Sequence, residues 1–108
     1  MKKDIEPGQA LKLAEMVEYQ DKAVISRTLI KGSCGSITLF CFDKGQSISE
    51  HTASFDALVH IIEGRAEITI DGMAHQLDQG HAILMPANIP HSLQAITRFK
   101  MLLIMMKE

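Results

Sequence analysis

The turn at Asp71-Gly72 constrains the fold of this chain more tightly than any other feature. The preceding segment, RAEITI at residues 65–70, alternates polar and apolar residues, as a strand with one buried face does. Asp-Gly is a preferred sequence for the type I′ turn that joins two antiparallel strands. The segment MAHQL at residues 73–77 then returns along the first strand. The sequence therefore predicts a β-hairpin whose inner face carries Ala66, Ile68 and Ile70.

Short β-rich segments separated by turn residues make up most of the remaining chain. We predict strands at residues 23–30, 37–43, 56–62, 82–85, 91–96 and 99–106, with a loop at 31–36. Short strands at this spacing are typical of a β-sandwich or small barrel, and no helical segments separate them as crossovers. Residues 1–10 are expected to be an extended lead-in, and residues 11–20 either a short amphipathic helix or a strand. The fold class is therefore all-β.

Length and charge limit the domain count and the partners. A chain of 108 residues is expected to form one domain, 1–108, in which residues 1–22 are an N-terminal lead-in. The formal net charge is −2 without a basic cluster, so we expect no nucleic-acid partner. We expect no secretory signal, since no apolar stretch follows the N-terminal lysines, and the longest apolar run, 101–106, is too short to span a bilayer. We expect a cytoplasmic protein without membrane association.

The segment FKMLLIMM at residues 99–106 is apolar on both faces of the expected strand, apart from Lys100. A sandwich strand normally keeps one face in water. A homodimer contact would bury the second face, and we predict a homodimer on this basis. The alternative is that the N-terminal segment of the same chain covers it.

Two motifs carry a family resemblance. The segment GQSISEHTASFDALVHIIEG supplies Gly45, His51 and Gly64, and the segment GHAILMPANIPHSLQA supplies Gly80, Pro86 and His91. Together, over residues 45–95, they resemble the two motifs of the cupin family, G(x5)HxH(x3–4)E(x6)G and G(x5)PxG(x2)H(x3)N. The resemblance implies a double-stranded β-helix, the RmlC-like jelly roll. Asn88 stands at the position of the last signature glycine, where it suits a left-handed backbone.

Only two of the four metal-ligand positions of the family carry a ligand residue in this chain. The resemblance implies a metal site of two His and one Glu from the first motif and one His from the second. His51 and His91 match, whereas Ala53 and Ala57 stand at the second His and the Glu positions. The cofactor expected is a divalent transition metal (Mn, Fe, Ni or Zn) held weakly by the two histidines, or none. Asp56 is a further pocket candidate if a bulge turns it inward.

Strand alternation and turn position give expectations for the other three histidines. His75 should pair with Ile68 across the hairpin and face inward, which makes it a pocket candidate. His60 should face away from the barrel interior, and His81 should be exposed at a turn.

The sequence thus predicts a small cupin-type protein that binds a small molecule in its barrel pocket, with His51 and His91 as polar anchors. The family includes dioxygenases, isomerases and decarboxylases, and the residues select no reaction, so enzymatic activity stays open. One alternative is a non-catalytic sensing or scaffold protein that has lost its metal chemistry. Another is a metal-free isomerase with His51 or His91 as the base.

Overall fold

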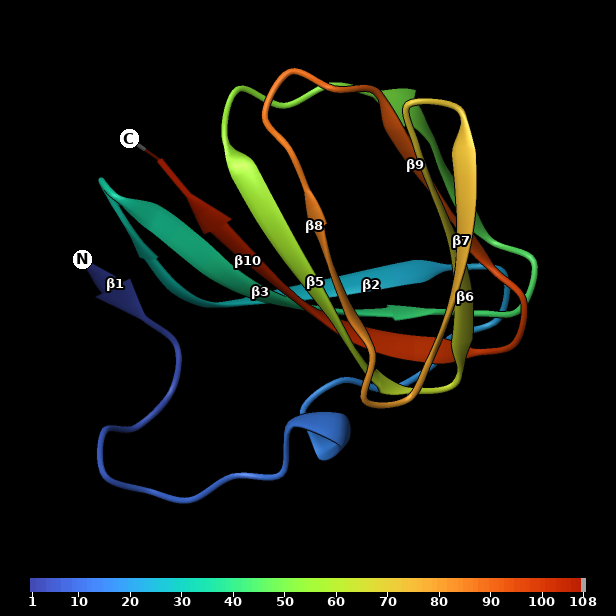
Figure 1. The fold of residues 1–108 in the computed structure, drawn as a ribbon. Helices are drawn as coiled ribbons and strands as arrows, with labels where there is room; N and C mark the ends of the chain where they lie inside the picture. Colours follow the sequence, from blue (N-terminus) through green and yellow to red (C-terminus); the bar gives the residue numbers. More distant parts are fainter. Residues whose placement is uncertain (108) are drawn as a thin grey trace.

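The computed structural model describes residues 1–107, and its regular secondary structure is almost entirely antiparallel β-strand (Figure 1). The strands are β1 (Lys2–Lys3), β2 (Val24–Gly32), β3 (Gly35–Phe42), β4 (Ser47–His51), β5 (Asp56–Glu63), β6 (Arg65–Ile70), β7 (Met73–Asp78), β8 (Ala82–Met85), β9 (His91–Ala95) and β10 (Phe99–Met106). A six-stranded sheet has the order β1-β2-β3-β10-β5-β8, and a four-stranded sheet has the order β4-β9-β6-β7. The two sheets enclose one core, which confirms the prediction of an all-β jelly roll.

The predicted hairpin forms between β6 and β7. Asp71 and Gly72 have φ angles of 51° and 78°, the positive values that a type I′ turn requires at both central residues. Ile68 pairs with His75 in the predicted register. This hairpin supplies two of the four strands of the smaller sheet.

Three segments differ from the sequence prediction. β4 was not predicted, because its sequence SISEH is polar and most of its residues are exposed. The loop expected at 31–36 is shorter, since β2 continues to Gly32 and β3 begins at Gly35. The segment 11–20 forms neither a full helix nor a strand, but one 3₁₀ turn, η1 (Leu13–Glu15). No helix within residues 1–107 has the length and apolar character needed to cross a bilayer.

Apolar side chains fill the space between the sheets. The rings of Phe42 and Phe99 stack with their centroids 4.4 Å apart. Around them lie Ala57, Val59, Ile61, Ala66, Ile68, Leu77, Met85, Leu93, Ala95 and Met101, all almost completely buried. The barrel interior is therefore a packed core, and polar chemistry is confined to its rim.

A second core forms on the outer face of the larger sheet, under the N-terminal segment. Val17 packs there against Leu39, Cys41 and Leu102. The buried amine of Lys100 donates a hydrogen bond to the carbonyl oxygen of Ala14. The phenol of Tyr19 donates to Glu63 at 2.6 Å, and burial together with this bond raises the pKa of Tyr19. The N-terminal segment therefore covers part of the second apolar face of β10, around Leu102.

Gly64, between β5 and β6, lies in a tightly packed turn. Its φ is 82°, and a Cβ atom there would lie 2.0 Å from the carbonyl oxygen of Arg98. Gly72 has a similar φ of 78° but open space around the same position. We expect Gly64→Ala to lower the free energy of unfolding by about 3 kcal/mol or more, and Gly72→Ala by only about 1–2 kcal/mol.

Urea unfolding of both variants measures this difference. Equal losses in the two variants would mean that the backbone around Arg98 relaxes, contrary to the packing described here.

Candidate functional site

His51 and His91, which come from different motifs, meet at the rim of the barrel. They are register partners in the antiparallel pairing of β4 with β9. Their Nε2 atoms are 3.1 Å apart, and their rings lie edge to face at 72° with centroids separated by 4.3 Å. The arrangement brings together the two residues that the sequence predicted as metal ligands.

The loops that flank the pair hold it in place. The register of β4 against β9 shifts between Ile48 and His51, and the chain then turns away after His51. The backbone N–H of Asn88 donates to the carbonyl oxygen of Ala53 at 2.7 Å, which joins the loop after β4 to the loop before β9. Asn88 has a φ of 64°, so its predicted left-handed conformation is confirmed.

Backbone carbonyls fix the tautomer of each ring. The Nδ1 atom of His51 lies 2.8 Å from the carbonyl oxygen of Ser49, and that of His91 lies 3.2 Å from the carbonyl oxygen of Ile89. A carbonyl oxygen only accepts, so both Nδ1 atoms carry a proton and donate it. Each neutral ring then presents an unprotonated Nε2 atom to the other. No pattern of residue types predicts these two carbonyl contacts, because backbone conformation alone places the carbonyls.

The two rings differ in their exposure. His91 is only 4% exposed, whereas His51 is open to solvent. Burial lowers the pKa of His91, and the adjacent His51 lowers it further, although the bond to Ile89 opposes the shift. Neutral His91 is therefore the favoured form near pH 7. The two Nδ1 protons are used in the contacts to the backbone carbonyls, so no proton remains for the contact between the two Nε2 atoms. A cation bound by both Nε2 atoms would remove the repulsion between their lone pairs.

The carboxylate of Asp56 is directed away from the pair. β5 pairs regularly with β8 from Ala57 onward, so Ala57 faces the core and Asp56 faces outward. The carboxylate accepts a hydrogen bond from the backbone N–H of Ala87 at 2.8 Å. No bulge reverses its direction, and the structure does not bring Asp56 to the histidines.

The other histidines lie apart from the pair. His75 is on the inner face of β7, half-buried, but β6 lies between its strand and the strand of His91. His60 points outward from β5 opposite Leu102, as alternation predicted. His81 is exposed, and its Nδ1 accepts a hydrogen bond from the backbone N–H of Asp78 at 2.9 Å.

Among residues 1–107, no third ionisable ligand joins the two histidines. Within the described residues, no group of three or more His, Cys, Asp or Glu side chains is placed to hold a metal ion. Neither histidine is among the residues of the described chain, 1–107, that line the larger grooves beside Ile104, Phe55, Thr38 and Lys31. The site is therefore an open two-histidine centre above a filled barrel.

The lowered pKa of His91 predicts a pH dependence of stability. The unfolded chain takes up a proton at the ordinary pKa of about 6.5, and the folded chain only at lower pH. Between these two values the unfolded state binds more protons, so the free energy of unfolding must fall as the pH is lowered. We expect His91→Asn to remove this part of the decrease between pH 7.5 and 5.

Urea unfolding of the wild type and the variant across this range tests the prediction. Identical pH profiles would show that His91 titrates normally in the folded protein.

Comparisons with known proteins agree with this geometry. The family model described as "Cupin domain" matches residues 38–106. No match is found among curated proteins. A conserved protein of unknown function from Streptococcus pyogenes is 41% identical, with a TM-score of 0.93 over 100% of this chain and 96% of that chain.

Two further solved structures are similar. A cupin superfamily protein from Desulfitobacterium hafniense is 32% identical, with a TM-score of 0.92 over 98% of this chain and 97% of that chain. A Cupin 2 conserved barrel domain protein from Leptotrichia buccalis is 38% identical, with a TM-score of 0.87, and the match covers 90% of this chain but 47% of that one. The matched motifs, the sheet order and these similarities agree, and the chain belongs to the cupin family.

Proposed function

We propose that this cupin binds a small molecule at the rim of its barrel through the His51–His91 pair, which serves as a weak anchor for a divalent metal. The observation that carries the proposal is the 3.1 Å separation of the two Nε2 atoms, with both Nδ1 atoms directed at backbone carbonyls. Both rings are held by backbone carbonyls, so they need no rearrangement to present these atoms.

The donor set fits two positions in the shell of a divalent transition metal. Two nitrogens bound to one ion at about 2.1 Å, at right or tetrahedral angles, lie about 3.0–3.4 Å apart. The observed separation of 3.1 Å falls within this range. The carbonyls of Ser49 and Ile89 then orient each ring from behind, as outer partners of ligating histidines do. A metal held here would supply positive charge and open positions for oxygen ligands.

The charge of the site favours an anionic ligand. A divalent metal held by the two neutral rings would give the site a net positive charge. His51 is exposed, so a ligand can approach from solvent without entering the packed core. We therefore propose a small carboxylate as the ligand class.

A second candidate is proton transfer without a metal. The lowered pKa of His91 favours an unprotonated Nε2 at neutral pH, which can accept a proton from a bound molecule. In this case the proton accepted by the Nε2 atom of His91 is shared with the Nε2 atom of His51, which lies 3.1 Å away. The metal-binding measurement separates this candidate from the first.

We expect the untagged wild-type protein to bind about one Zn²⁺ or Ni²⁺ per chain, since the pair provides two converging nitrogen ligands. His51→Ala and His91→Ala should each lose this binding. His81→Ala, a substitution at an exposed histidine apart from the pair, is the matched control and should retain it. Isothermal titration calorimetry and elemental mass spectrometry give the stoichiometry. No binding by the wild type would exclude the metal anchor.

Restoring a family ligand should strengthen the site. Ala53 occupies the position at which the cupin pattern has its second histidine. We expect Ala53→His to raise the affinity for Zn²⁺ by roughly tenfold or more, because a third imidazole replaces water in the shell. Competition with a chromogenic chelator measures the change. Unchanged affinity would mean that position 53 cannot reach the ion held by the pair.

A further inference from the structure

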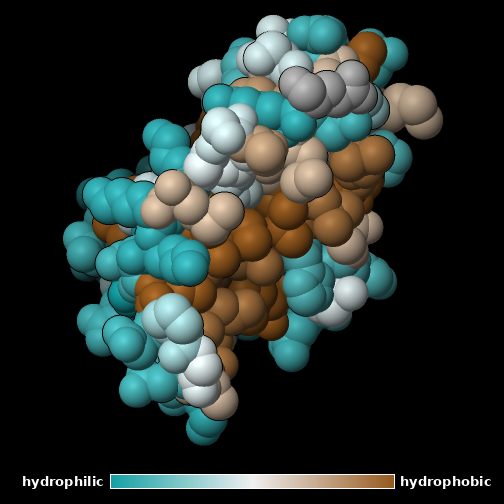
Figure 2. All heavy atoms as spheres, turned by 90° about the vertical axis from the view of Figure 1, so that its left-hand side faces the viewer, coloured by the Kyte–Doolittle hydropathy of each residue, from teal (hydrophilic) through white to brown (hydrophobic). Residues whose placement is uncertain are grey.

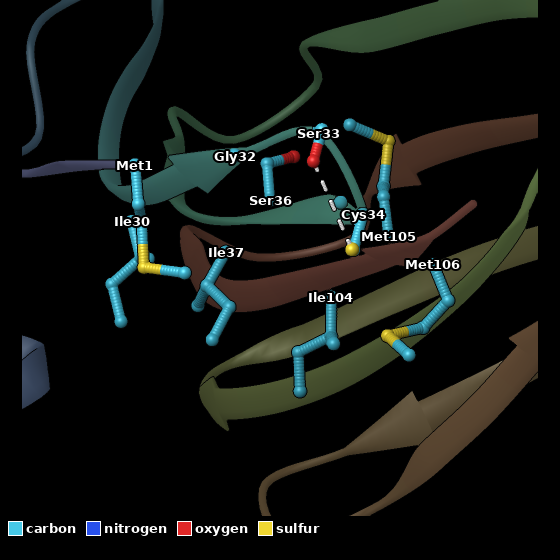
Figure 3. A pocket seen from close by; sticks show the side chains of 11 residues that line it. Met1, Ile30, Gly32, Ser33, Cys34, Ser36, Ile37, Ile104, Met105 and Met106 are labelled. Carbon is cyan, nitrogen blue, oxygen red and sulfur yellow. Dashed lines mark hydrogen bonds between the residues drawn. The ribbon is translucent and has the colours of Figure 1, made fainter.

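The larger sheet has two chemically different faces at the end that carries the turn between β2 and β3. Figure 2 looks onto this end and shows apolar residues gathered in one band, with hydrophilic residues on either side of it. Figure 3 shows Ile37 and Ile104 on one side of the sheet and Ser36 on the other. Alternation along β3 places Thr38 on the side of Ser36 and of the core residue Phe42. The polar face therefore continues the inner face of the barrel.

A groove of about 260 Å³ lies on this polar face. Strands β2 and β3, the residue after β10 and the residue before β5 all contribute to its lining. Neither histidine of the pair is among the residues of the chain 1–107 that line it. We call it the hydroxyl groove, and its polar and aromatic side chains are those of Thr28, Lys31, Ser36, Thr38, Phe55 and Lys107.

A β-bulge turns Lys31 into this groove. Thr28 pairs with Thr38 and Lys31 pairs with Ser36, so β2 advances three residues where β3 advances two. Plain alternation from Thr28 would send Lys31 to the opposite, apolar face. Within the bulge, Leu29 enters the second core under the N-terminal segment. The extra residue therefore places an ammonium group beside hydroxyl groups, as bulges at functional sites do.

The hydroxyl groups of the groove retain hydrogen-bonding capacity. The Oγ1 atoms of Thr28 and Thr38 are 3.3 Å apart, so one of their two hydroxyl protons is used in this contact. Thr38 is only 7% exposed, whereas Thr28 is open to solvent. The second proton of the pair and the proton of Ser36 are available to a ligand. A molecule in the groove can therefore receive hydrogen bonds from two strands at once.

The groove is positively charged, although the whole chain carries a formal net charge of −2. Lys31 and Lys107 line it, and no acidic residue of the described chain does. Lys2 is the register partner of Lys31 and adds an ammonium group on the neighbouring strand. The carboxylate of Asp4, which lies next to these two lysines, is bound to the guanidinium of Arg27 at 2.8 Å. The local field therefore favours an anion.

Lys107 stands at one side of the groove, next to an aromatic ring. Its backbone N–H donates to the carbonyl oxygen of Cys34 at 2.7 Å, and its amine lies 6.0 Å from the ring centroid of Phe55. Lys107 and Phe55 also line a second groove, which contains Asp56. The carboxylate of Asp56 is engaged by the backbone N–H of Ala87. Phe55 therefore offers an apolar contact beside the charged groups.

We propose that the hydroxyl groove binds a phosphate group, either inorganic phosphate or the phosphate of a small ester. Phosphate has acceptor oxygens in several directions and a charge of about −1.5 to −2 at pH 7, which matches hydroxyl donors from two strands and two ammonium groups. A carboxylate presents two oxygens in one plane and a single charge, so it fits these donors less well. This site is independent of the histidine pair and of any metal bound there.

Titration of the ¹⁵N-labelled protein with inorganic phosphate at constant ionic strength tests the site. We expect saturable shifts of the amide signals of Thr28, Lys31 and Ser36. Lys31→Met should weaken binding by roughly tenfold, because a charge-assisted contact is lost, and Thr28→Val should weaken it severalfold. Both side chains are exposed, so neither substitution disturbs the barrel core.

Lys3→Met is the matched control. Lys3 is also an exposed lysine, but it pairs with Ile30 and so lies on the opposite, apolar face. Its substitution removes the same charge and should leave the phosphate affinity within about twofold of the wild type. Absence of saturable binding by the wild type, or equal losses in Lys31→Met and Lys3→Met, would overturn the proposal.

Phenyl phosphate and acetate define the ligand more closely. Tighter binding of phenyl phosphate than of inorganic phosphate would assign the groove to a phosphate ester whose body contacts Phe55, and equal binding would assign it to inorganic phosphate. Acetate bound in the groove as tightly as phosphate would overturn the assignment to phosphate. His51→Ala should bind phosphate as the wild type does, so the outcome here is separate from metal binding at the histidine pair.

Discussion

The pairing of β4 with β9 is the contact on which the site depends. It joins the first part of the first motif to the last part of the second and places His51 opposite His91 in register. The hydrogen bond from Asn88 to Ala53 joins the loop after β4 to the loop before β9 at one end of this pairing. β4 is a short polar strand with little apolar surface of its own. Without its pairing to β9, nothing would hold the two histidines side by side.

The sequence predicted the parts of the fold that alternation and turn chemistry determine. β6, β8 and β10 have the expected bounds, and the Asp71-Gly72 turn has the expected positive φ angles. β4 was missed because alternation of apolar residues is the signal for a strand, and SISEH has almost none. The N-terminal segment was ambiguous because its position depends on long-range contacts such as the one between Lys100 and Ala14.

The site was predictable only in part. Motif spacing alone indicated His51 and His91, and the pairing of their strands brings them to 3.1 Å. The direction of the Asp56 side chain could not be predicted from the sequence, because one bulge in β5 would reverse it. Regular pairing of β5 instead turns Asp56 outward, where it accepts a hydrogen bond from Ala87. The orienting carbonyls of Ser49 and Ile89 are backbone groups and leave no trace in the residue types.

Both metal binding and proton transfer at this site depend on which nitrogens of the two histidine rings carry protons. Long-range ¹H–¹⁵N correlation spectra of the histidine rings report the protonation of each nitrogen directly. We expect protonated Nδ1 atoms on both His51 and His91, with Nε2 signals that shift when Zn²⁺ is added. A spectrum in which both Nε2 atoms are protonated and stay unchanged with Zn²⁺ would contradict the account.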